Sequence, residues 1–428
     1  MMVEINIPKA EKRVVIVGAG FAGLELAKRL SNSTFQVVLI DKNNYHQFQP
    51  LLYQVATAGL EPSSIVFPLR KMFQKAQNVF IRVTSVDEVK STEKIIVTPL
   101  GSLSYDYLVI ATGASTNYYG NENIAQNTIP MKSVSEALYL RNHIFEDYES
   151  ALTSADADVR QSFSDIVIVG GGPTGVELAG ALAEMKAYIL PKDYREMNIK
   201  DVDIYLIQSA DILLKGMSAE AADAAEQFLL KRGVIIKKNT RVLDYDGETV
   251  KMNDGTSIRT KKVIWAAGIT PNIINGLAAE SYANGNRLVT NAQHQVQGYQ
   301  DIYAIGDNAL LTETAFPTGH PQVAQVAIQM AKNLAKNLVN SSKNRAASDF
   351  EYNDLGSMAT IGRNQAVVDL PKFKFQGFFA WIVWLFVHLF AIVGVKNKIF
   401  VFLNWVWNYF TYDQSLRLII KPFVPKKK

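Results

Sequence analysis

The sequence predicts an α/β protein with two Rossmann-like dinucleotide-binding units, because one kind of glycine fingerprint occurs twice in the chain. Residues 18–23 and 170–175 both read Gly-x-Gly-x-x-Gly. An apolar run that indicates a buried strand precedes each fingerprint, at residues 13–17 and 165–169, and a helical pattern follows. In this setting the glycines permit a tight turn and bring backbone N–H groups close to a pyrophosphate at the helix N-terminus. The chain is therefore expected to bind two dinucleotides.

The composition is that of a folded protein with more than one domain. The 428 residues exceed the size at which a single hydrophobic core usually stops growing, and 48% are hydrophobic against 20% charged. A net charge of +4 gives little support to nucleic-acid binding. The lack of cysteine excludes disulfides, iron–sulfur ligation and every dithiol mechanism, and no metal site is expected. Because the first strand begins near Arg13, we expect no room for a signal peptide.

Three later segments have the pattern of a buried strand that ends in a turn of small residues. They lie at residues 105–113, 262–268 and 301–307, and the last one closes in Gly-Asp. The strand at residues 36–40 leads into Asp41. An acidic residue roughly 20 positions after such glycines usually holds a ribose hydroxyl, and a turn or helix-capping role is the alternative for Asp41.

Together these segments resemble the two-dinucleotide-binding flavoproteins, a superfamily in which the second nucleotide domain is inserted into the first. The resemblance implies an FAD-binding domain made from residues 1–120 and 296–350. It places an NAD(P)H-binding domain at residues 121–295 and a C-terminal membrane-anchoring helical segment at residues 351–428. In that superfamily the aspartate of the Gly-Asp turn, here Asp307, bonds the ribityl chain of the flavin.

The same resemblance implies two sets of cofactor contacts, drawn mostly from turns and strand ends. The residues expected to contact FAD are Gly18, Gly20, Phe21, Ala22, Gly23, Asp41, Lys42, Gln49, Val83, Ala111, Thr112, Gly113, Gly306, Asp307, Ala324 and Gln325. The residues expected to contact the nicotinamide dinucleotide are Gly170, Gly172, Pro173, Thr174, Gly175, Glu177, Gln208, Ala267 and Gly268.

Two further motifs narrow the resemblance to type II NADH:quinone oxidoreductases. Residues 43–56 resemble the loop that follows the FAD ribose strand in that family, and residues 324–329 resemble its Ala-Gln-x-x-x-Gln quinone element. Gln325 and Gln329 stand four residues apart, on one face of the predicted helix. The resemblance assigns their amides to a quinone oxygen near the flavin, and the alternative is a pair of solvated glutamines.

Two residues of the second unit bear on catalysis and on nucleotide choice. Glu177 resembles the family glutamate at the nicotinamide face of the flavin, with substrate positioning or proton transfer as its role. A carboxylate in the first turn of a helix also favours the helix dipole, which is the structural alternative. Gln208 follows the strand at residues 203–207, where NADH-selective members usually place a glutamate. We therefore expect NADPH to be accepted beside NADH.

The C-terminal segment is apolar and aromatic. Residues 378–395 contain no formal charge, and as one helix they would extend about 27 Å, just short of a ~30 Å hydrocarbon core. Residues 399–410 are amphipathic and too short to cross. Four of the five tryptophans fall in this region, and a basic tail follows at residues 421–428. We expect an interfacial anchor in one leaflet, and a spanning hairpin is the alternative.

The expected function is NAD(P)H:quinone oxidoreduction without proton pumping. Hydride would pass from NADH, or NADPH, to FAD, and two electrons would then reach ubiquinone or menaquinone in the membrane. The resemblance implies a monotopic respiratory-chain protein on the cytoplasmic face of the inner membrane, with a homodimer possible. A sulfide:quinone oxidoreductase is set aside because it needs redox cysteines. A soluble NAD(P)H-dependent flavin reductase and a slow-turnover signalling flavoprotein stay open as alternatives.

Overall fold

The computed structural model describes residues 4–8, 10–413 and 416–420, and the chain divides into two compact units. The first unit runs up to His46 and adds Phe67–Ser115 and Ile269–Asp354. The second unit comprises Gln47–Val66, Thr116–Gly268 and the chain from Leu355 onward. Each unit is built around its own parallel sheet.

The first unit contains a five-stranded parallel sheet with the order β21-β9-β1-β2-β5. Most of its strand residues are apolar and buried, which is typical of a parallel sheet covered on both faces. The strands are β1 (Arg13–Val17), β2 (Gln36–Asp41), β5 (Val79–Val83), β9 (Tyr107–Ile110) and β21 (Ile302–Ala304).

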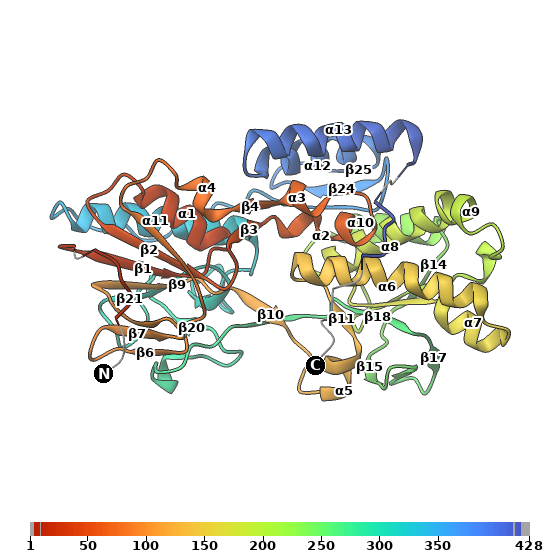
Figure 1. The fold of residues 1–428 in the computed structure, drawn as a ribbon, viewed down its shortest axis with the longest axis horizontal. Helices are drawn as coiled ribbons and strands as arrows, with labels where there is room; N and C mark the ends of the chain where they lie inside the picture. Colours follow the sequence, from red (N-terminus) through yellow and green to blue (C-terminus); the bar gives the residue numbers. More distant parts are fainter. Residues whose placement is uncertain (1–3, 9, 414–415, 421–428) are drawn as a thin grey trace, which may run out of the picture. The chain divides into compact units, whose positions relative to one another are not determined.

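Two helices and a small antiparallel sheet cover the first sheet. Helices α1 (Phe21–Leu30) and α11 (Ala324–Ser341) pack against each other on one face of it (Figure 1). On the other face lie β6 (Glu88–Lys90), β7 (Ile95–Thr98) and β8 (Gly101–Ser104), which form an antiparallel meander (Figure 1).

The second unit repeats the architecture, with a parallel sheet in the order β11-β18-β12-β13-β14. Its strands are β11 (Ile129–Pro130), β12 (Ile166–Val169), β13 (Ile204–Ile207), β14 (Val234–Lys237) and β18 (Lys262–Trp265). Its longer helices are α6 (Val134–Thr153), α7 (Ala157–Ser164), α8 (Pro173–Tyr188) and α10 (Ala219–Lys231). An antiparallel sheet joins β15 (Val242–Tyr245), β16 (Thr249–Met252) and β17 (Ser257–Arg259).

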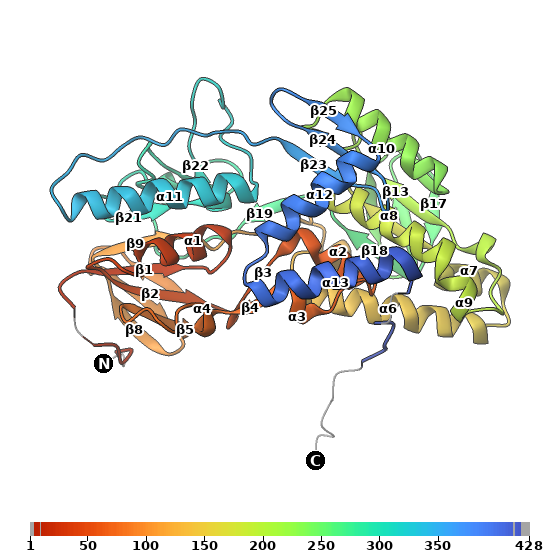
Figure 2. The same ribbon diagram turned by 90° about the horizontal axis from the view of Figure 1, so that it is seen from above.

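The C-terminal part of the second unit adds a three-stranded antiparallel sheet and two helices. Strands β23 (Ser357–Thr360), β24 (Ala366–Asp369) and β25 (Lys374–Gln376) lead into α12 (Phe378–Ala391) and α13 (Val395–Thr411). The two helices run side by side, with aromatic contacts between them (Figure 2). The uncharged run at residues 378–395 is therefore not one helix, because α12 ends at Ala391 and Gly394 turns the chain with a positive φ of 85°.

The other elements are short. They are β3 (Tyr45–Gln47), η1 (Gln49–Leu51), α2 (Leu52–Ala56), α3 (Pro62–Ile65), β4 (Val66–Pro68), α4 (Leu69–Met72), β10 (Ala114–Thr116), α5 (Glu122–Asn127), α9 (Leu190–Asp193), η2 (Ile199–Asp201), β19 (Ile269–Pro271), η3 (Ala279–Ser281), β20 (Leu288–Val289), η4 (Gly306–Asn308) and β22 (Ala309–Leu310).

The compact units and the domain boundaries expected from the sequence differ in two places. Residues 47–66 belong to the second unit, although the sequence boundaries assign them to the FAD-binding domain. Residues 269–295 belong to the first unit, although they were expected in the NAD(P)H-binding domain. Residues 47–66 contact helices α6, α8 and α13, and the carbonyl oxygen of Asn275 accepts from the N–H of Val89 in β6 at 2.8 Å. These partners are distant in sequence, so residue order alone does not reveal them.

Candidate dinucleotide and acceptor sites

The first fingerprint lies in the turn between β1 and α1. Its three glycines differ in the space that a side-chain Cβ would find at each position. A Cβ at Gly18, where φ is +106°, would run into the carbonyl oxygen of Ala111, and one at Gly23 would run into the carbonyl oxygen of Gly18. These two glycines are therefore required by the fold. At Gly20, apart from its neighbours along the chain, no heavy atom of the described residues lies within 4 Å of the Cβ position. The fold gives no reason for a glycine there, whereas a phosphate on the α1 N-terminus would supply one.

The second fingerprint repeats this division between β12 and α8. A Cβ at Gly170, where φ is +114°, would meet the carbonyl oxygen of Ala266, and one at Gly175 would meet that of Gly170. The space around a Cβ at Gly172 is open to 4 Å with respect to the described part of the chain. Both turns thus contain one glycine whose missing side chain leaves room for a ligand, in the position where a pyrophosphate binds.

Asp41 and Gln208 occupy matching positions at the ends of β2 and β13. Asp41 accepts hydrogen bonds from the backbone N–H of Ala19 at 2.6 Å and of Asn43 at 2.7 Å. Burial raises the pKa of its carboxyl above the ordinary value. Gln208 accepts from the N–H of Gly171 at 3.1 Å and donates to the carbonyl oxygen of Ile212 at 3.1 Å. Each side chain is therefore tied to the second residue of its own fingerprint.

The first unit brings most of its expected FAD residues to one edge of its sheet. Asp41 with Lys42, Val83, Ala111–Gly113 and Gly306–Asp307 follow the carboxyl ends of β2, β5, β9 and β21, which are parallel. A Cβ at Gly306 would lie 3.3 Å from that of Ala22 in α1. Gln49 is the exception, because it belongs to the second unit and its amide donates to the carbonyl oxygen of Lys132 at 3.4 Å.

Two residues at this edge did not stand out in the sequence. Asn308 is buried and accepts from the N–H of Gly113 at 2.7 Å, so it holds the turn after β9 beside the Gly-Asp turn. His46 is buried against the first fingerprint, with Nδ1 2.9 Å from the carbonyl oxygen of Ala19. Burial lowers its pKa to about 4, which keeps the imidazole neutral. Asn308 directly follows the Gly-Asp pair, and that adjacency was the signal available in the sequence.

The expected dinucleotide residues of the second unit also collect at the carboxyl edge of one sheet. Pro173 and Thr174 lie within the fingerprint and are the first two residues of α8. Ala267 and Gly268 follow β18, where the hydroxyl of Tyr119 donates to the carbonyl oxygen of Ala267 at 2.7 Å. A Cβ at Gly268 would collide with that hydroxyl, so Tyr119 and Gly268 depend on each other.

Glu177 is a buried carboxyl in the first turns of α8. Its side chain is 7% exposed, and the backbone N–H of Thr360 in β23 reaches its Oε1 at 3.5 Å. Burial raises the pKa of Glu177 to about 8, against the weaker opposing effect of the Thr360 hydrogen bond. The equivalent residue of the first fingerprint, Glu25, instead forms an ion pair with Arg29 at 2.7 Å. At neutral pH Glu177 is therefore mostly protonated and can donate a proton.

Gln325 and Gln329 lie on the same face of α11, in its first two turns. The amide of Gln325 donates to Oδ1 of Asp354 at 3.4 Å. The amide of Gln329 donates to the carbonyl oxygen of Asn353 at 2.8 Å and accepts from the N–H of the same residue at 3.0 Å. Both glutamines thus bind the chain segment that returns along the helix, which the sequence did not reveal.

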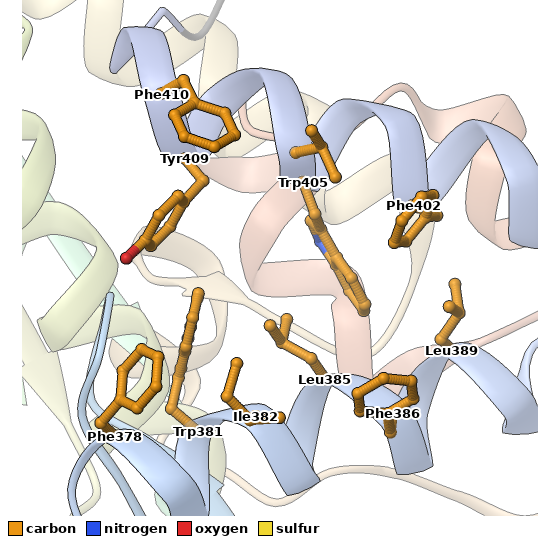
Figure 3. Close-up of a pocket in the computed structure, with 11 residues that line it drawn as sticks. Phe378, Trp381, Ile382, Leu385, Phe386, Leu389, Phe402, Trp405, Tyr409 and Phe410 are labelled. Atoms are coloured by element: carbon orange, nitrogen blue, oxygen red, sulfur yellow. The ribbon is translucent and has the colours of Figure 1, made fainter.

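The two C-terminal helices enclose an apolar groove of about 340 Å³ within the second unit. Figure 3 shows side chains from α12 and α13 that point toward one another across this groove. The residues that line it are Phe378, Trp381, Ile382, Leu385, Phe386, Leu389, Phe402, Trp405, Val406, Tyr409 and Phe410. The pair also exposes aromatic rings that do not line the groove, since Phe379 is 77% exposed and Phe390 is 69% exposed.

The polar side of α13 faces the protein. Asn397 donates to the carbonyl oxygen of Val66 at 3.1 Å, and Asn408 donates to that of Gly59 at 3.1 Å. Trp405 donates through Nε1 to the amide oxygen of Gln54 at 2.8 Å. The asparagines therefore attach the helix to residues 54–66, and the helix turns its aromatic side outward.

The structure corrects one expectation about the C-terminal region and does not describe the residues of another. Trp384 was grouped with tryptophans at the headgroup level, but it is 1% exposed and stacks on His388 with ring centroids 4.0 Å apart. It therefore belongs to the protein interior. The basic tail at residues 421–428 lies outside the described residues. Over the part of the chain that is described, neither α12 nor α13 nor any other helix has the length and apolar character needed to cross a membrane.

We refer to the two fingerprint turns, at residues 18–23 and 170–175, as the nucleotide cradles. Together with the C-terminal helices they are typical of a class of flavin-linked oxidoreductases. Residues 12–331 match the family model described as pyridine nucleotide-disulphide oxidoreductase. Residues 355–412 match the model described as NDH2 C-terminal domain, which covers β23 through α13. The first match spans well over half of the chain.

Sequence identity to curated proteins shows more closely which kind of oxidoreductase this chain is. The chain is 34% identical to type II NADH:quinone oxidoreductase Ndh of Mycobacterium tuberculosis, over 93% of this chain and 88% of that protein. It is 28% identical to the mitochondrial internal alternative NAD(P)H-ubiquinone oxidoreductase A1 of Arabidopsis thaliana, over 93% and 84%. The chain belongs to the type II NADH:quinone oxidoreductase family.

Solved structures share the fold. The structure of NDH2 from Plasmodium falciparum in complex with NADH superposes with a TM-score of 0.88 at 20% identity, and it covers 96% of this chain and 100% of that one. Sulfide:quinone oxidoreductase of Aquifex aeolicus gives 0.71 at 21% identity, over 94% and 95%. The two structures thus share an α/β architecture with this chain, which contains no cysteine.

Proposed function

We propose that the chain oxidises NADH, and to a comparable extent NADPH, and passes two electrons through bound FAD to ubiquinone or menaquinone in the membrane. The observation that carries the proposal is the pair of cradles, in which Gly20 and Gly172 leave open space at two helix N-termini. One cradle would hold FAD and the other the nicotinamide dinucleotide. We propose that this reaction is not coupled to proton pumping.

The residues around the first cradle fit FAD. The first N–H groups of α1 would hold the pyrophosphate beside Gly20, and Asp41 would accept from the ribose. A carboxylate offers about four acceptor sites, and the N–H groups of Ala19 and Asn43 occupy two of them. Asp307 would bond the ribityl chain at the same sheet edge. When bound, FAD supplies the two-electron chemistry, while the protein aligns the reactants and excludes water.

Glu177, Gln325 and Gln329 are the residues we assign to the chemistry of the acceptor. Glu177 would position the substrate and donate a proton, for which its raised pKa of about 8 is suited. Gln325 would present its amide to a quinone oxygen. Gln208 lacks the charge that repels a 2′-phosphate, which supports the use of both nucleotides.

The helices α12 and α13 support a monotopic attachment to one leaflet, and we propose that this leaflet is the cytoplasmic one of the inner membrane. Their aromatic side chains form an exposed apolar surface, which would enter the headgroup and acyl boundary. A soluble reductase of a protein acceptor would leave this surface without a role, so the structure favours the membrane acceptor.

The experiment is a steady-state assay in detergent. We expect micromolar quinone to accelerate NADH oxidation at least tenfold over the rate with oxygen as the acceptor. An equal rate with and without quinone would contradict the proposal and would favour the signalling flavoprotein.

Acid denaturation should release all flavin from the protein, because the chain contains no cysteine for a thioether link.

A further inference from the structure

Tyr119 is an exposed aromatic residue in an uncommon backbone conformation within the second unit. Its φ is +52°, in the left-handed region that residues with a side chain seldom adopt, and it is 68% exposed. The N–H of Tyr119 donates to Oδ1 of Asn117 at 2.8 Å, which stabilises this turn. Backbone strain of this kind is concentrated at functional sites. Tyr119 is therefore a candidate for a role beyond folding.

Three hydrogen bonds join the turn around Tyr119 to the end of β18. Nε1 of Trp265 donates to the carbonyl oxygen of Asn117 at 2.8 Å, and the N–H of Asn117 donates to that of Gly268 at 3.1 Å. The hydroxyl of Tyr119 donates to the carbonyl oxygen of Ala267 at 2.7 Å. This hydroxyl occupies the space that a side chain would need at Gly268, where a Cβ would collide with it. The ring is thus held at its hydroxyl end against the Ala267–Gly268 peptide.

The peptide that Tyr119 holds adjoins the second nucleotide cradle. A Cβ at Gly170 would lie 2.8 Å from the Cα of Ala267, so Ala267 packs against the first glycine of that fingerprint. A chain of direct contacts therefore leads from the fingerprint through Ala267 to the hydroxyl of Tyr119.

The order of the sheet indicates which half of a dinucleotide would lie beside Tyr119. Strand β12 lies between β18 and β13. A pyrophosphate at Gly172 would lie after β12, and the adenosine ribose would lie beside Gln208, after β13. The other nucleoside must then extend in the opposite direction, over the carboxyl end of β18. That nucleoside carries the nicotinamide.

We propose that Tyr119 is a binding residue for the nicotinamide nucleoside half of NADH and NADPH. Its exposed ring forms one wall of this subsite, and its hydroxyl holds the Ala267–Gly268 peptide in the orientation that the substrate meets. The inference rests on the proposed function, because it requires a nicotinamide dinucleotide in the second cradle. It gives the exposed ring a partner and explains why position 268 has no side chain.

Calorimetric titrations of the oxidised holoprotein with NAD⁺ and with ADP test this assignment. ADP would reach only the positions after β12 and β13, whereas NAD⁺ would also reach the end of β18. We expect Tyr119→Ala to raise the Kd of NAD⁺ roughly tenfold, through the loss of one hydrogen bond and one aromatic contact. Tyr119→Phe keeps the ring and should raise the Kd of NAD⁺ roughly threefold, the size of one hydrogen bond. The Kd of ADP should change little in either variant.

The matched control is Tyr139→Ala. Tyr139 is a tyrosine of the same unit that is 58% exposed on α6, and its removal should leave the Kd of NAD⁺ and that of ADP unchanged. In steady-state assays, Tyr119→Ala should raise the KM for NADH and leave the KM for quinone as it is in the wild type.

Three results would overturn the inference. Equal losses for NAD⁺ and ADP would assign Tyr119 to the folding of the cradle. Tighter binding of NAD⁺ by either variant would show that the ring blocks the subsite. Unchanged binding of NAD⁺ in both variants would place Tyr119 outside the subsite. If Tyr119→Ala does not fold, the titrations of Tyr119→Phe decide by the same criteria.

The wild-type titration distinguishes failure of the proposed function from failure of this assignment. A wild-type protein that does not bind NAD⁺ would contradict the function, and the inference would fall with it. A wild-type protein that binds NAD⁺, with any of the three results above in the variants, would overturn the role of Tyr119 alone.

Discussion

Glu177 illustrates how one buried carboxyl can be prepared for proton transfer at physiological pH. Its raised pKa of about 8 follows from burial, and the protonated form dominates below that pH. We expect kcat for quinone reduction to fall as pH rises through about 8, since the acid form is then lost. Glu177→Gln should lower kcat and remove this limb of the pH profile. A profile that keeps the limb in Glu177→Gln would assign the titration to another group.

The same pKa predicts a stability change of defined sign. In the unfolded chain Glu177 ionises near its ordinary value of 4.5, whereas the folded form holds the proton up to about 8. The native state therefore binds more protons between these values, and stability relative to Glu177→Gln declines as pH rises from about 4.5 to 8. Thermal unfolding of both proteins across this range measures the difference, which should level off above pH 8. A difference that does not depend on pH would contradict the buried neutral carboxyl.

The side chain at position 208 bears on the choice between NADH and NADPH. Its amide oxygen binds Gly171, in the position that Asp41 takes in the first unit, so a ribose hydroxyl would lie beside it. A carboxylate about 4 Å from a 2′-phosphate would repel it by on the order of 4 kcal/mol at an effective dielectric of ~20, and less when solvent-exposed. We expect kcat/KM for NADH and NADPH within about tenfold to thirtyfold of each other in the wild type. Gln208→Glu should reject NADPH, chiefly through its KM. Rejection of NADPH by roughly a thousandfold in the wild type would show that selectivity arises elsewhere.

At the scale of elements, Arg363 fastens the end of α13 to the second unit. Its guanidinium donates to the carbonyl oxygens of Asn408 at 2.6 Å and Tyr409 at 2.9 Å, and it lies 3.6 Å from the ring centroid of Tyr412. Charge-assisted bonds to the last carbonyls of a helix stabilise its C-terminus. Arg363→Ala should speed amide hydrogen exchange in the last turns of α13 by roughly tenfold or more.

A conservative variant of Arg363 distinguishes the effect of its positive charge from that of its planar guanidinium. Arg363→Lys keeps the positive charge but loses the planar fork, so its exchange rates should fall between those of the wild type and Arg363→Ala. Unchanged exchange in Arg363→Ala would show that the asparagine bonds to residues 59–66 hold α13 by themselves.

The exposed aromatic surface of the helix pair predicts how the protein attaches to membranes. Phe386, Phe390 and Phe410 are 58%, 69% and 77% exposed, so serine at these positions should leave the fold intact. We expect the triple serine variant to lose most of its sedimentation with lipid vesicles. Phe373→Ser removes an aromatic ring that is 70% exposed on the β24–β25 turn, outside the helix pair, and is the matched control. Equal vesicle binding by the triple variant and the wild type would place the attachment elsewhere.

The elements that the sequence predicted well are those with a local signal. The two strand–turn–helix units, the strands that follow them and the amphipathic character of α13 all appear in the periodicity and the glycine spacing. The sequence separates residues 378–395 from residues 399–410, but the position of the break was less visible, because hydrophobicity continues through Gly394, where the chain turns.

In the molecule as a whole, contacts between segments that are distant along the chain could not be predicted from the sequence. Asn333 and Asn337 read as ordinary polar helix residues until residues 346–354 are placed beside them. Trp384 reads as an interfacial tryptophan until the fold buries it. In each case the property depends on which segment returns to cover the residue. Glu177 is the clearest example, since burial within the fold is what raises its pKa.

In the function proposed above, one chain couples a nicotinamide dinucleotide to a membrane quinone through a flavin. Anaerobic stopped flow tests this coupling most directly, with purified holoprotein in detergent and absorbance recorded at the flavin band. We expect NADH to bleach the band and a subsequent addition of quinone to restore it, with one quinone reduced for each flavin. A flavin that NADH reduces but quinone fails to reoxidise would rule out this function.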